Sequence, residues 1–188
     1  MANQNNRQKR RSSKNEPEEK QYDEKTIQVD RVARVVKGGR RFRFRALVVV
    51  GDRKNKVGVG SAKAADVTAA VTKATEVAKK HFTEVKIYKG TIPHDVYAKV
   101  AGAKILLKPA SPGTGVIASG VVRTILEAAG VKNALSKSLG SSNKTNLAYA
   151  TIDALNSLES AENWITRQTK PIKTPAKTTS KPKTEAAK

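Results

Sequence analysis

The residues with the clearest chemical potential are three arginines that alternate with two phenylalanines. Side chains alternate between the two faces of a strand, so Arg41, Arg43 and Arg45 are expected on one face. Phe42 and Phe44 should lie on the other face, in register with the apolar residues that follow, and we expect both in the core. Guanidinium groups spaced about 7 Å apart along one strand repel each other unless an anion lies across them. The pattern therefore favours nucleic-acid phosphate over a solvated face.

The elements that must position these arginines are two strands joined by a glycine turn. Gly38-Gly39 is typical of a hairpin turn, and it would connect a strand over 27–36 to the arginine strand. Residues 25–45 hold eight Lys/Arg and one acid, Asp30. The expected nucleic-acid-binding residues of this hairpin and of the segment after it are Arg31, Arg34, Lys37, Gly38, Gly39, Arg40, Arg41, Arg43, Arg45, Arg53, Lys54, Lys56, Gly58, Gly60 and Lys63.

The segment after the hairpin is a cationic turn over 51–56 followed by a short strand, Val57–Gly60. Glycines at 58 and 60 leave little side chain to pack, so another backbone, of protein or RNA, could approach closely there. The same glycines with Lys63 resemble a phosphate-binding loop only superficially. A P-loop needs Gly-Lys-Ser/Thr at a fixed spacing and a dinucleotide loop needs a third glycine, and neither pattern is present.

The charge of the chain points to a polyanionic partner. The 188 residues carry a formal net charge of +21. The excess is not confined to the ends, because residues 21–165 alone hold 24 Lys/Arg and 12 acids. This balance disfavours an ordinary metabolic enzyme. An anionic membrane would also suit the charge, but the longest apolar run is only 46–50, and no membrane partner is expected.

Several site classes are excluded by composition. The chain has no cysteine and two histidines, so no disulfide, thiolate site or histidine-rich metal site is expected. No cofactor is expected either. The first residues lack the apolar region of a secretory signal, which predicts a soluble intracellular protein.

Periodicity predicts two α+β units between disordered basic tails. Residues 1–22 are polar and charged, and 166–188 are rich in Lys and Pro, so both are expected to be disordered. The first unit, 23–86, reads β-β-β-α, with a helix opening at Asp66 and an apolar stripe along one face.

The second unit, 87–165, is expected to be α+β as well, with Trp164 packed where the fold ends. Its helix from Ala118 should stop at Gly130. The strands predicted around and within this unit cover 84–88, 96–100, 104–108 and 134–139, and its last helix covers 145–158.

The loop 109–115 leaves two alternatives open. Its glycines could deliver free backbone N–H groups to a helix start, which makes an anion site, or it could be a tight connection. A phosphate loop of a small-molecule kinase is a related interpretation, but phosphoryl transfer needs Mg²⁺ carboxylates and a base. The acids of this unit are scattered among lysines, so catalysis is not expected. A DNA-compacting protein is a third class that composition alone leaves open.

The chain resembles the family of the fifth protein of the bacterial small ribosomal subunit over about 24–160. The markers are ordered and correctly spaced: Arg31-Val32, Val36-Lys37-Gly38-Gly39-Arg40, Val49-Val50-Gly51-Asp52, Val57-Gly58-Val59-Gly60, Lys63-Ala64, Pro109-Ala110-Ser111, Gly113-Thr114-Gly115, Gly120, Leu126-Glu127, Ala129-Gly130-Val131 and Gly140-Ser141. Two departures, Ala62 in place of a usual glycine and Thr68 in place of a frequent proline, concern the backbone path around 58–68.

The resemblance implies a structural protein of the cytoplasmic ribosome. It implies an N-terminal domain like a double-stranded-RNA-binding module and a C-terminal domain with a left-handed β-α-β crossover. The implied partners are small-subunit (16S) ribosomal RNA and the fourth and eighth proteins of the subunit, with messenger RNA nearby where it enters. The implied roles are subunit assembly and decoding accuracy, and the loop 37–40 is linked to the spectinomycin response.

A protein-docking role is predicted for two lysines of the second unit. Lys104 and Lys108 alternate with Ile105 and Leu107, so both lysines share one strand face. Solvated lysines are the alternative. We expect this face to contact the neighbouring fourth protein.

Overall fold

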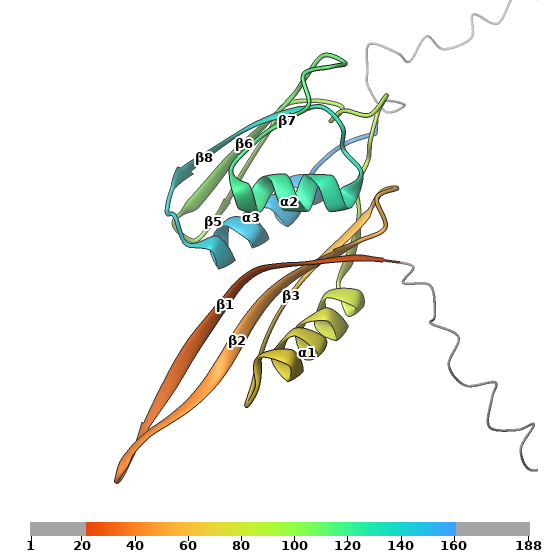
Figure 1. Cartoon of the computed structure of the whole chain (residues 1–188). Helices are drawn as coiled ribbons and strands as arrows, with labels where there is room; N and C mark the ends of the chain where they lie inside the picture. The colour runs from red at the N-terminus through yellow and green to blue at the C-terminus, as the bar shows by residue number, and fades with distance from the viewer. Residues whose placement is uncertain (1–21, 161–188) are drawn as a thin grey trace, which may run out of the picture.

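The computed structural model describes residues 22–160, and its layers alternate between helix and sheet. Both tails and Trp164 lie outside the described residues. Figure 1 shows α1 on one face of the N-terminal sheet, α2 and α3 on its other face, and the C-terminal sheet beyond them. The elements are β1 (Asp23–Val36), β2 (Gly39–Gly51), β3 (Lys56–Ala64), α1 (Val67–Lys80), β4 (Phe82–Glu84), β5 (Val96–Val100), β6 (Ala103–Pro109), β7 (Val116–Ile117), α2 (Gly120–Ala129), β8 (Ala134–Gly140) and α3 (Lys144–Asn156).

The N-terminal sheet is antiparallel with strand order β1-β2-β3-β4. The predicted β-β-β-α order is confirmed, and a short β4 follows the helix. A bulge at Ile27 shifts the β1–β2 register between Thr26 and Gln28. The bulge turns Ile27 toward the apolar core that β2 shares with the second unit.

Helix α1 packs so closely on β3 that its backbone fills the space left by two glycines. A Cβ on Gly60 would lie 2.1 Å from the carbonyl oxygen of Ala74, and one on Gly58 would lie 2.3 Å from that of Ala78. Both glycines are buried. The close backbone approach predicted for them is therefore made by this chain's own helix, which is the protein alternative and leaves no space for RNA against these two glycines.

The segment after β4 differs from the predicted strand over 84–88. The alternation is present, because Glu84 and Lys86 are exposed while Val85 is buried and Ile87 packs against the same core, but the pairing of β3 with β4 ends at Glu84. Instead the N–H of Val85 donates to the carbonyl of Asn55 at 2.7 Å, and Tyr88 forms an isolated bridge with Thr91. This irregular segment connects the two sheets.

The C-terminal sheet has the order β5-β6-β8-β7, with β7 and β8 parallel and joined by α2. This is the β-α-β unit expected of the second domain, although the handedness of its crossover stays a prediction. The two-residue β7 was not predicted, since it is too short to show a period. Gly130 ends α2 in the left-handed conformation, as predicted, with a φ of 91°.

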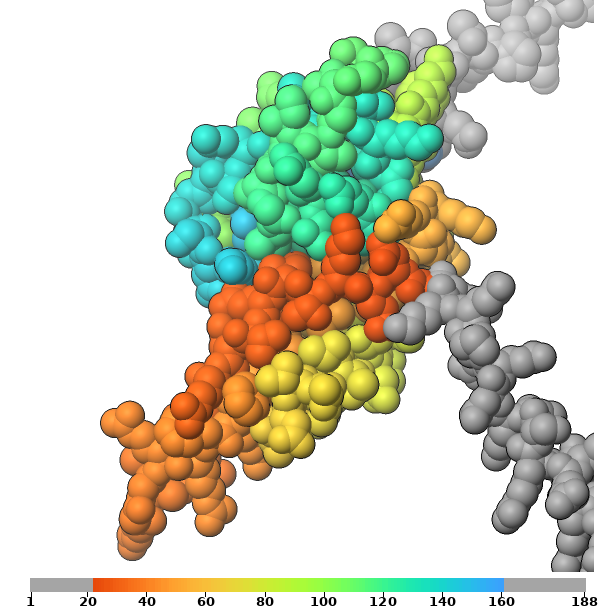
Figure 2. Space-filling view, in the orientation of Figure 1, coloured from red at the N-terminus to blue at the C-terminus, as the bar shows by residue number. Residues whose placement is uncertain are grey.

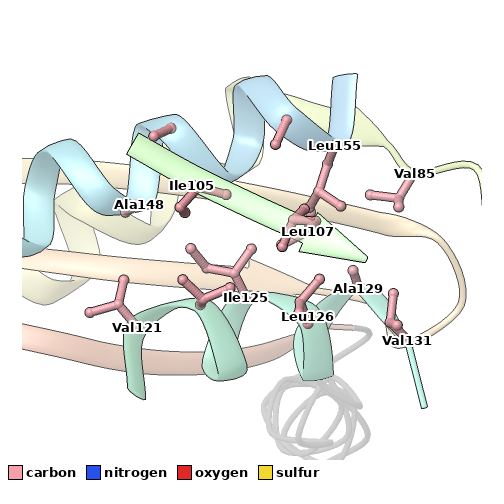
Figure 3. Packing of buried hydrophobic residues seen from close by; sticks show 14 of the residues in the cluster. Val85, Ile105, Leu107, Val121, Ile125, Leu126, Ala129, Val131, Ala148 and Leu155 are labelled. Carbon is pink, nitrogen blue, oxygen red and sulfur yellow. The ribbon is translucent and has the colours of Figure 1, made fainter. Parts of the chain in front are cut away.

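One apolar core joins the two units. Leu47 and Val49 of β2 belong to the same buried cluster as Ile125 and Leu126 of α2 and Leu155 of α3. Figure 3 shows the side chains of α2 and α3 converging with those of β6 in this cluster. The opposite face of β2 forms a second cluster with the alanines of α1. The centre of the N-terminal sheet is thus buried on both faces.

Adding a methyl group at Gly60 should separate α1 from β3. We expect Gly60→Ala to lower the free energy of unfolding by about 1–3 kcal/mol, because the Cβ overlaps helix backbone that cannot move independently. Urea denaturation measures the change. Gly120→Ala is the matched control, since a Cβ at this position would have no atom within 4 Å and its φ is not positive. Equal stability of the Gly60 variant and this control would contradict the packing described.

Candidate nucleic-acid interface

The β1–β2 hairpin extends beyond the rest of the sheet as a two-stranded arm. The last pair between β2 and β3 joins Phe44 to Ala64, so the part of β2 before Phe44 has only β1 beside it. We call residues 31–43 the hairpin arm. It projects away from both units in Figure 2, where its tip is orange. The arm holds six Lys/Arg and no acid.

One face of the arm carries three arginines, Arg34, Arg41 and Arg43, which we call the arginine face. Arg34 and Arg41 are direct cross-strand partners, and both are exposed. Like charges in this position destabilise a strand pair, because their Cβ atoms lie only about 5 Å apart. Within residues 22–160 none of the three forms a salt bridge. The face is therefore open to an external anion.

The base of the arginine face differs, because Arg45 already has an acidic partner. Its guanidinium donates to Asp30 through Nη2 at 2.6 Å and Nε at 3.2 Å. These hydrogen bonds, with one from Gln28, hold the pKa of Asp30 below its ordinary value. Lys63 lies opposite Arg45 and is exposed, which extends the face onto β3. Sequence reasoning placed Arg45 with the free arginines and did not foresee this pair.

The other face of the arm is where the structure overturns the prediction for Phe42. Phe44 is half-buried and packs against the cluster under α1, but Phe42 is 48% exposed. The reason is that β3 and α1 do not reach this far along β2. Arg31 instead lies over the ring of Phe42, with its guanidinium carbon 3.8 Å from the ring centroid. The Arg-Phe alternation predicted the strand correctly, but it does not show where the covering elements end.

The tip of the arm is a two-residue turn made by Lys37 and Gly38. Gly38 has a φ of 88° and Gly39 a φ of 150°, and no atom lies within 4 Å of a Cβ built on either. Lys37 and Arg40 are exposed beside them. The glycines are thus required by backbone conformation rather than by any contact within the chain.

The second cationic turn, between β2 and β3, is fixed against α2. The N–H of Arg53 donates to the carbonyl of Ala128 at 2.9 Å, and its side chain donates to Asp23 at 2.7 Å. Hydrogen bonding to Asp23 also raises the pKa of Arg53. Lys54 and Lys56 are exposed. Of the three cations predicted to bind RNA here, Arg53 is therefore already paired with an acid.

Asp52 holds the backbone of this turn. Its Oδ1 accepts hydrogen bonds from the N–H groups of Lys54, Asn55 and Lys56 at 2.8, 3.0 and 2.9 Å. Burial alone would raise the pKa of Asp52, but these backbone donors outweigh it and lower the pKa below its ordinary value. The ionised carboxylate is thus the form that stabilises the turn.

The loop 109–115 does not offer the free N–H groups of an anion site. The N–H groups of Gly113 and Gly115 both donate to Oδ1 of Asn133, at 3.1 and 3.0 Å. Strand β7 also separates the loop from α2. Of the two alternatives, the structure supports the tight connection, and the kinase-like interpretation loses its phosphate site.

The outer face of the C-terminal sheet carries Lys104 and Lys108, as their alternation predicted. Both lysines are exposed, whereas Ile105 and Leu107 are fully buried against the helices. Lys99 lies opposite Lys104 across the strand pair. A shallow groove on this face is lined by Leu106, Lys108, Ile117, Leu135, Ser136 and Lys137. Strand pairing brings Lys99 and Lys137 to this surface, and the predicted sites did not include them although Lys99 alternates with apolar residues in the predicted strand 96–100.

Neither a metal site nor a membrane-spanning element is found in the described part of the chain. Within residues 22–160 no three His, Asp or Glu side chains come together to hold a metal ion. None of the helices described there is long and apolar enough to cross a membrane.

Comparison with known proteins gives the same family for both halves of the chain. The family described as ribosomal protein S5, N-terminal domain, matches residues 22–86, and ribosomal protein S5, C-terminal domain, matches 95–168. A relative from Picosynechococcus sp., named small ribosomal subunit protein uS5, is 53% identical over 153 residues. That alignment covers 81% of this chain and 88% of the relative.

Neutralising Asp52 should weaken the second turn in a pH-dependent way. We expect Asp52→Asn to lower the free energy of unfolding by about 1 kcal/mol near neutral pH. Because the folded-state pKa is depressed, this stabilisation is complete above the unfolded-state pKa and is lost as the pH falls through the folded-state value. The difference from the parent should therefore shrink in urea titrations below about pH 4.

A carboxylate without such donors provides the control for this titration. Asp66 precedes α1, and its side chain makes no capping hydrogen bond. Near neutral pH, Asp66→Asn should lower the free energy of unfolding by less than Asp52→Asn does. A deficit in Asp52→Asn that stayed constant down to about pH 2 would show that the carboxylate charge does not hold the turn.

Proposed function

Because the chain belongs to the ribosomal protein S5 family, we propose that its hairpin arm binds 16S ribosomal RNA through the arginine face. As a member of this family it is a structural constituent of the small ribosomal subunit, and the family is not one of enzymes. The observation that carries the proposal is the cross-strand pair of Arg34 and Arg41. Two exposed guanidinium groups are held side by side with no carboxylate between them, and a phosphate backbone supplies the missing charge.

The geometry favours contacts with the backbone of RNA rather than with base edges. The arginines are spaced along an extended strand, and Arg34 doubles the charge density at one point. Phosphate contacts of this kind position a protein on RNA without reading its sequence. Lys63 and the exposed Lys54 and Lys56 would extend the same electrostatic footprint onto the sheet.

The protein contacts are proposed for the outer face of the C-terminal sheet. Its lysines surround exposed apolar side chains: Ile117 is 53% exposed and Leu139 is 42% exposed. Such a surface suits a partner that presents both apolar and acidic groups. We assign it to the neighbouring fourth protein of the subunit and leave the eighth protein to other parts of the same domain.

A role in assembly and in decoding accuracy follows from this division. The two units are packed together, so binding RNA at the arm and a protein at the C-terminal sheet would fix the positions of these partners relative to each other. We place this contact beside the path by which messenger RNA enters. Stop-codon readthrough in cells that carry only an arginine-face variant measures the accuracy role. If subunits that contain the variant showed unchanged readthrough, RNA binding by the arginine face would not contribute to decoding accuracy.

Replacing two arginines of the arm should weaken RNA binding and flatten its salt dependence. For the Arg41→Gln, Arg43→Gln double variant, we expect the log–log slope against salt to fall by about 0.7–0.9 per lost phosphate contact. Titration of labelled small-subunit RNA fragments at several salt concentrations measures this slope. Lys104→Gln with Lys108→Gln removes the same charge elsewhere and is the control. Equal effects of the two double variants would mean that net charge, not the arginine face, binds RNA.

Reversing the charge of the two lysines should impair protein docking and spare RNA binding, although Lys108→Glu also breaks the 3.2 Å salt bridge of Lys108 with Asp95. Surface ion pairs contribute about 0–1 kcal/mol each, so loss of both lysines should weaken association with the fourth protein by up to about 30-fold, and the glutamates of Lys104→Glu with Lys108→Glu add repulsion from acidic groups of the partner. The larger effect is expected on the association rate, measured by surface-immobilised binding. Binding of RNA fragments should be nearly unchanged. Loss of RNA binding with an intact protein contact would reverse the assignment of the two surfaces.

A further inference from the structure

A second binding feature lies on the face of the arm opposite the arginine face. Arg31 and Phe42 occupy this face, diagonal to each other across β1 and β2, and Val35 and Arg40 lie nearer the tip as a direct cross-strand pair. The aromatic ring is 48% exposed and Val35 is 76% exposed. These apolar side chains are free to be covered by a ligand, which would remove their surface from water.

The stack of Arg31 on Phe42 gives that surface a specific chemistry. A guanidinium carbon 3.8 Å from the ring centroid places two flat π groups in contact. Nucleobases stack on aromatic rings and on arginine planes alike, and such stacking is largely independent of base identity. Arg40 on the same face could meet the phosphate attached to a stacked base.

We propose that the Arg31–Phe42 stack binds an unpaired nucleobase of the RNA that the arginine face holds. The inference rests on the proposed RNA binding and adds a second mode to it: phosphates on one face and a splayed base on the other. A protein partner is disfavoured, because the arm has six cations and no acid, and Asp30 at its base is already engaged by Arg45. The pair is thus the point at which this arm distinguishes single-stranded from fully paired RNA.

Comparison of a base-containing and an abasic oligomer tests the stacking directly. The full chain is titrated with a short oligoadenylate and with a ribose-phosphate oligomer of the same length that lacks bases. Both oligomers have the same phosphates, so any difference in affinity comes from the bases. We expect the parent protein to prefer the oligoadenylate by about tenfold. Phe42→Leu should abolish most of that preference and leave the salt slope unchanged, whereas Phe42→Trp should retain it.

Matched variants separate the stack from general effects. Tyr97→Leu removes an aromatic that is 56% exposed on the C-terminal sheet and should leave the base preference intact. Phe42→Leu should unfold at the same urea concentration as the parent, since Phe42 is outside both core clusters. Arg31→Lys keeps the charge but loses the planar group, and should reduce the base preference severalfold.

Two outcomes would overturn the proposal. Equal affinity of the parent for the two oligomers, or an undiminished preference in Phe42→Leu, would show that no base stacks on this ring. If salt-dependent binding persisted in either case, only the stacking proposal would fail. If the parent bound neither oligomer nor structured ribosomal RNA, the proposed function of the arm would fail as well.

Discussion

Burial of one stretch of β2 on both faces is the constraint on which the rest of the structure depends. Ala46, Val48 and Val50 pack under α1, while Leu47 and Val49 join α2 and α3 on the opposite face. All five are at most 3% exposed. At about 1.5–3 kcal/mol for each fully buried valine or leucine, four of these five side chains contribute strongly to stability. A central strand so enclosed fixes the first unit against the second.

Close backbone contacts hold the N-terminal sheet firmly against the second unit. A Cβ on Gly51 would lie 2.2 Å from the carbonyl oxygen of Ala128, and one on Gly130 would lie 2.2 Å from that of Arg53. The salt bridge of Lys25 with Glu127, at 2.9 Å, joins β1 to α2 in the same region. Because β2 is held here, the part of it that continues into the hairpin arm projects from a fixed base. The arm therefore presents its two faces in a defined direction relative to the C-terminal sheet.

The fold was predictable from the sequence wherever a local period sets the secondary structure. The site was predictable only where the exposure of a side chain does not depend on residues distant in the sequence. The stripe of α1, the stop of α2 at Gly130 and the alternation around Lys104 are local signals, and each predicted the correct element. The prediction that Phe42 lies in the core was wrong, because its burial depends on where β3 and α1 end.

The other errors have the same origin in tertiary contacts. Gly58 and Gly60 were expected to be open to RNA, but the residues that cover them lie more than ten positions away in α1. Likewise, nothing beside Arg45 in the sequence shows that Asp30 reaches it across the strand pair. A period of two separates the faces of a strand but cannot say what covers either face.

The arm itself is a structure that its own contacts stabilise only weakly. A two-stranded hairpin is marginal in water, and this one adds repulsion between Arg34 and Arg41 to that cost. Branched residues such as Val32 and Val36 favour the strands, and the pair of Arg45 with Asp30 anchors the base. An RNA ligand of the kind proposed would remove this repulsion as well as add attraction, and would therefore stabilise the arm. Residues 31–43 contain no Asn, Gln, Asp or Glu to read base edges. The recognition proposed for this arm then relies on the path of the phosphates and on an unstacked base, with Arg and Lys as the only side chains that could also reach a base edge.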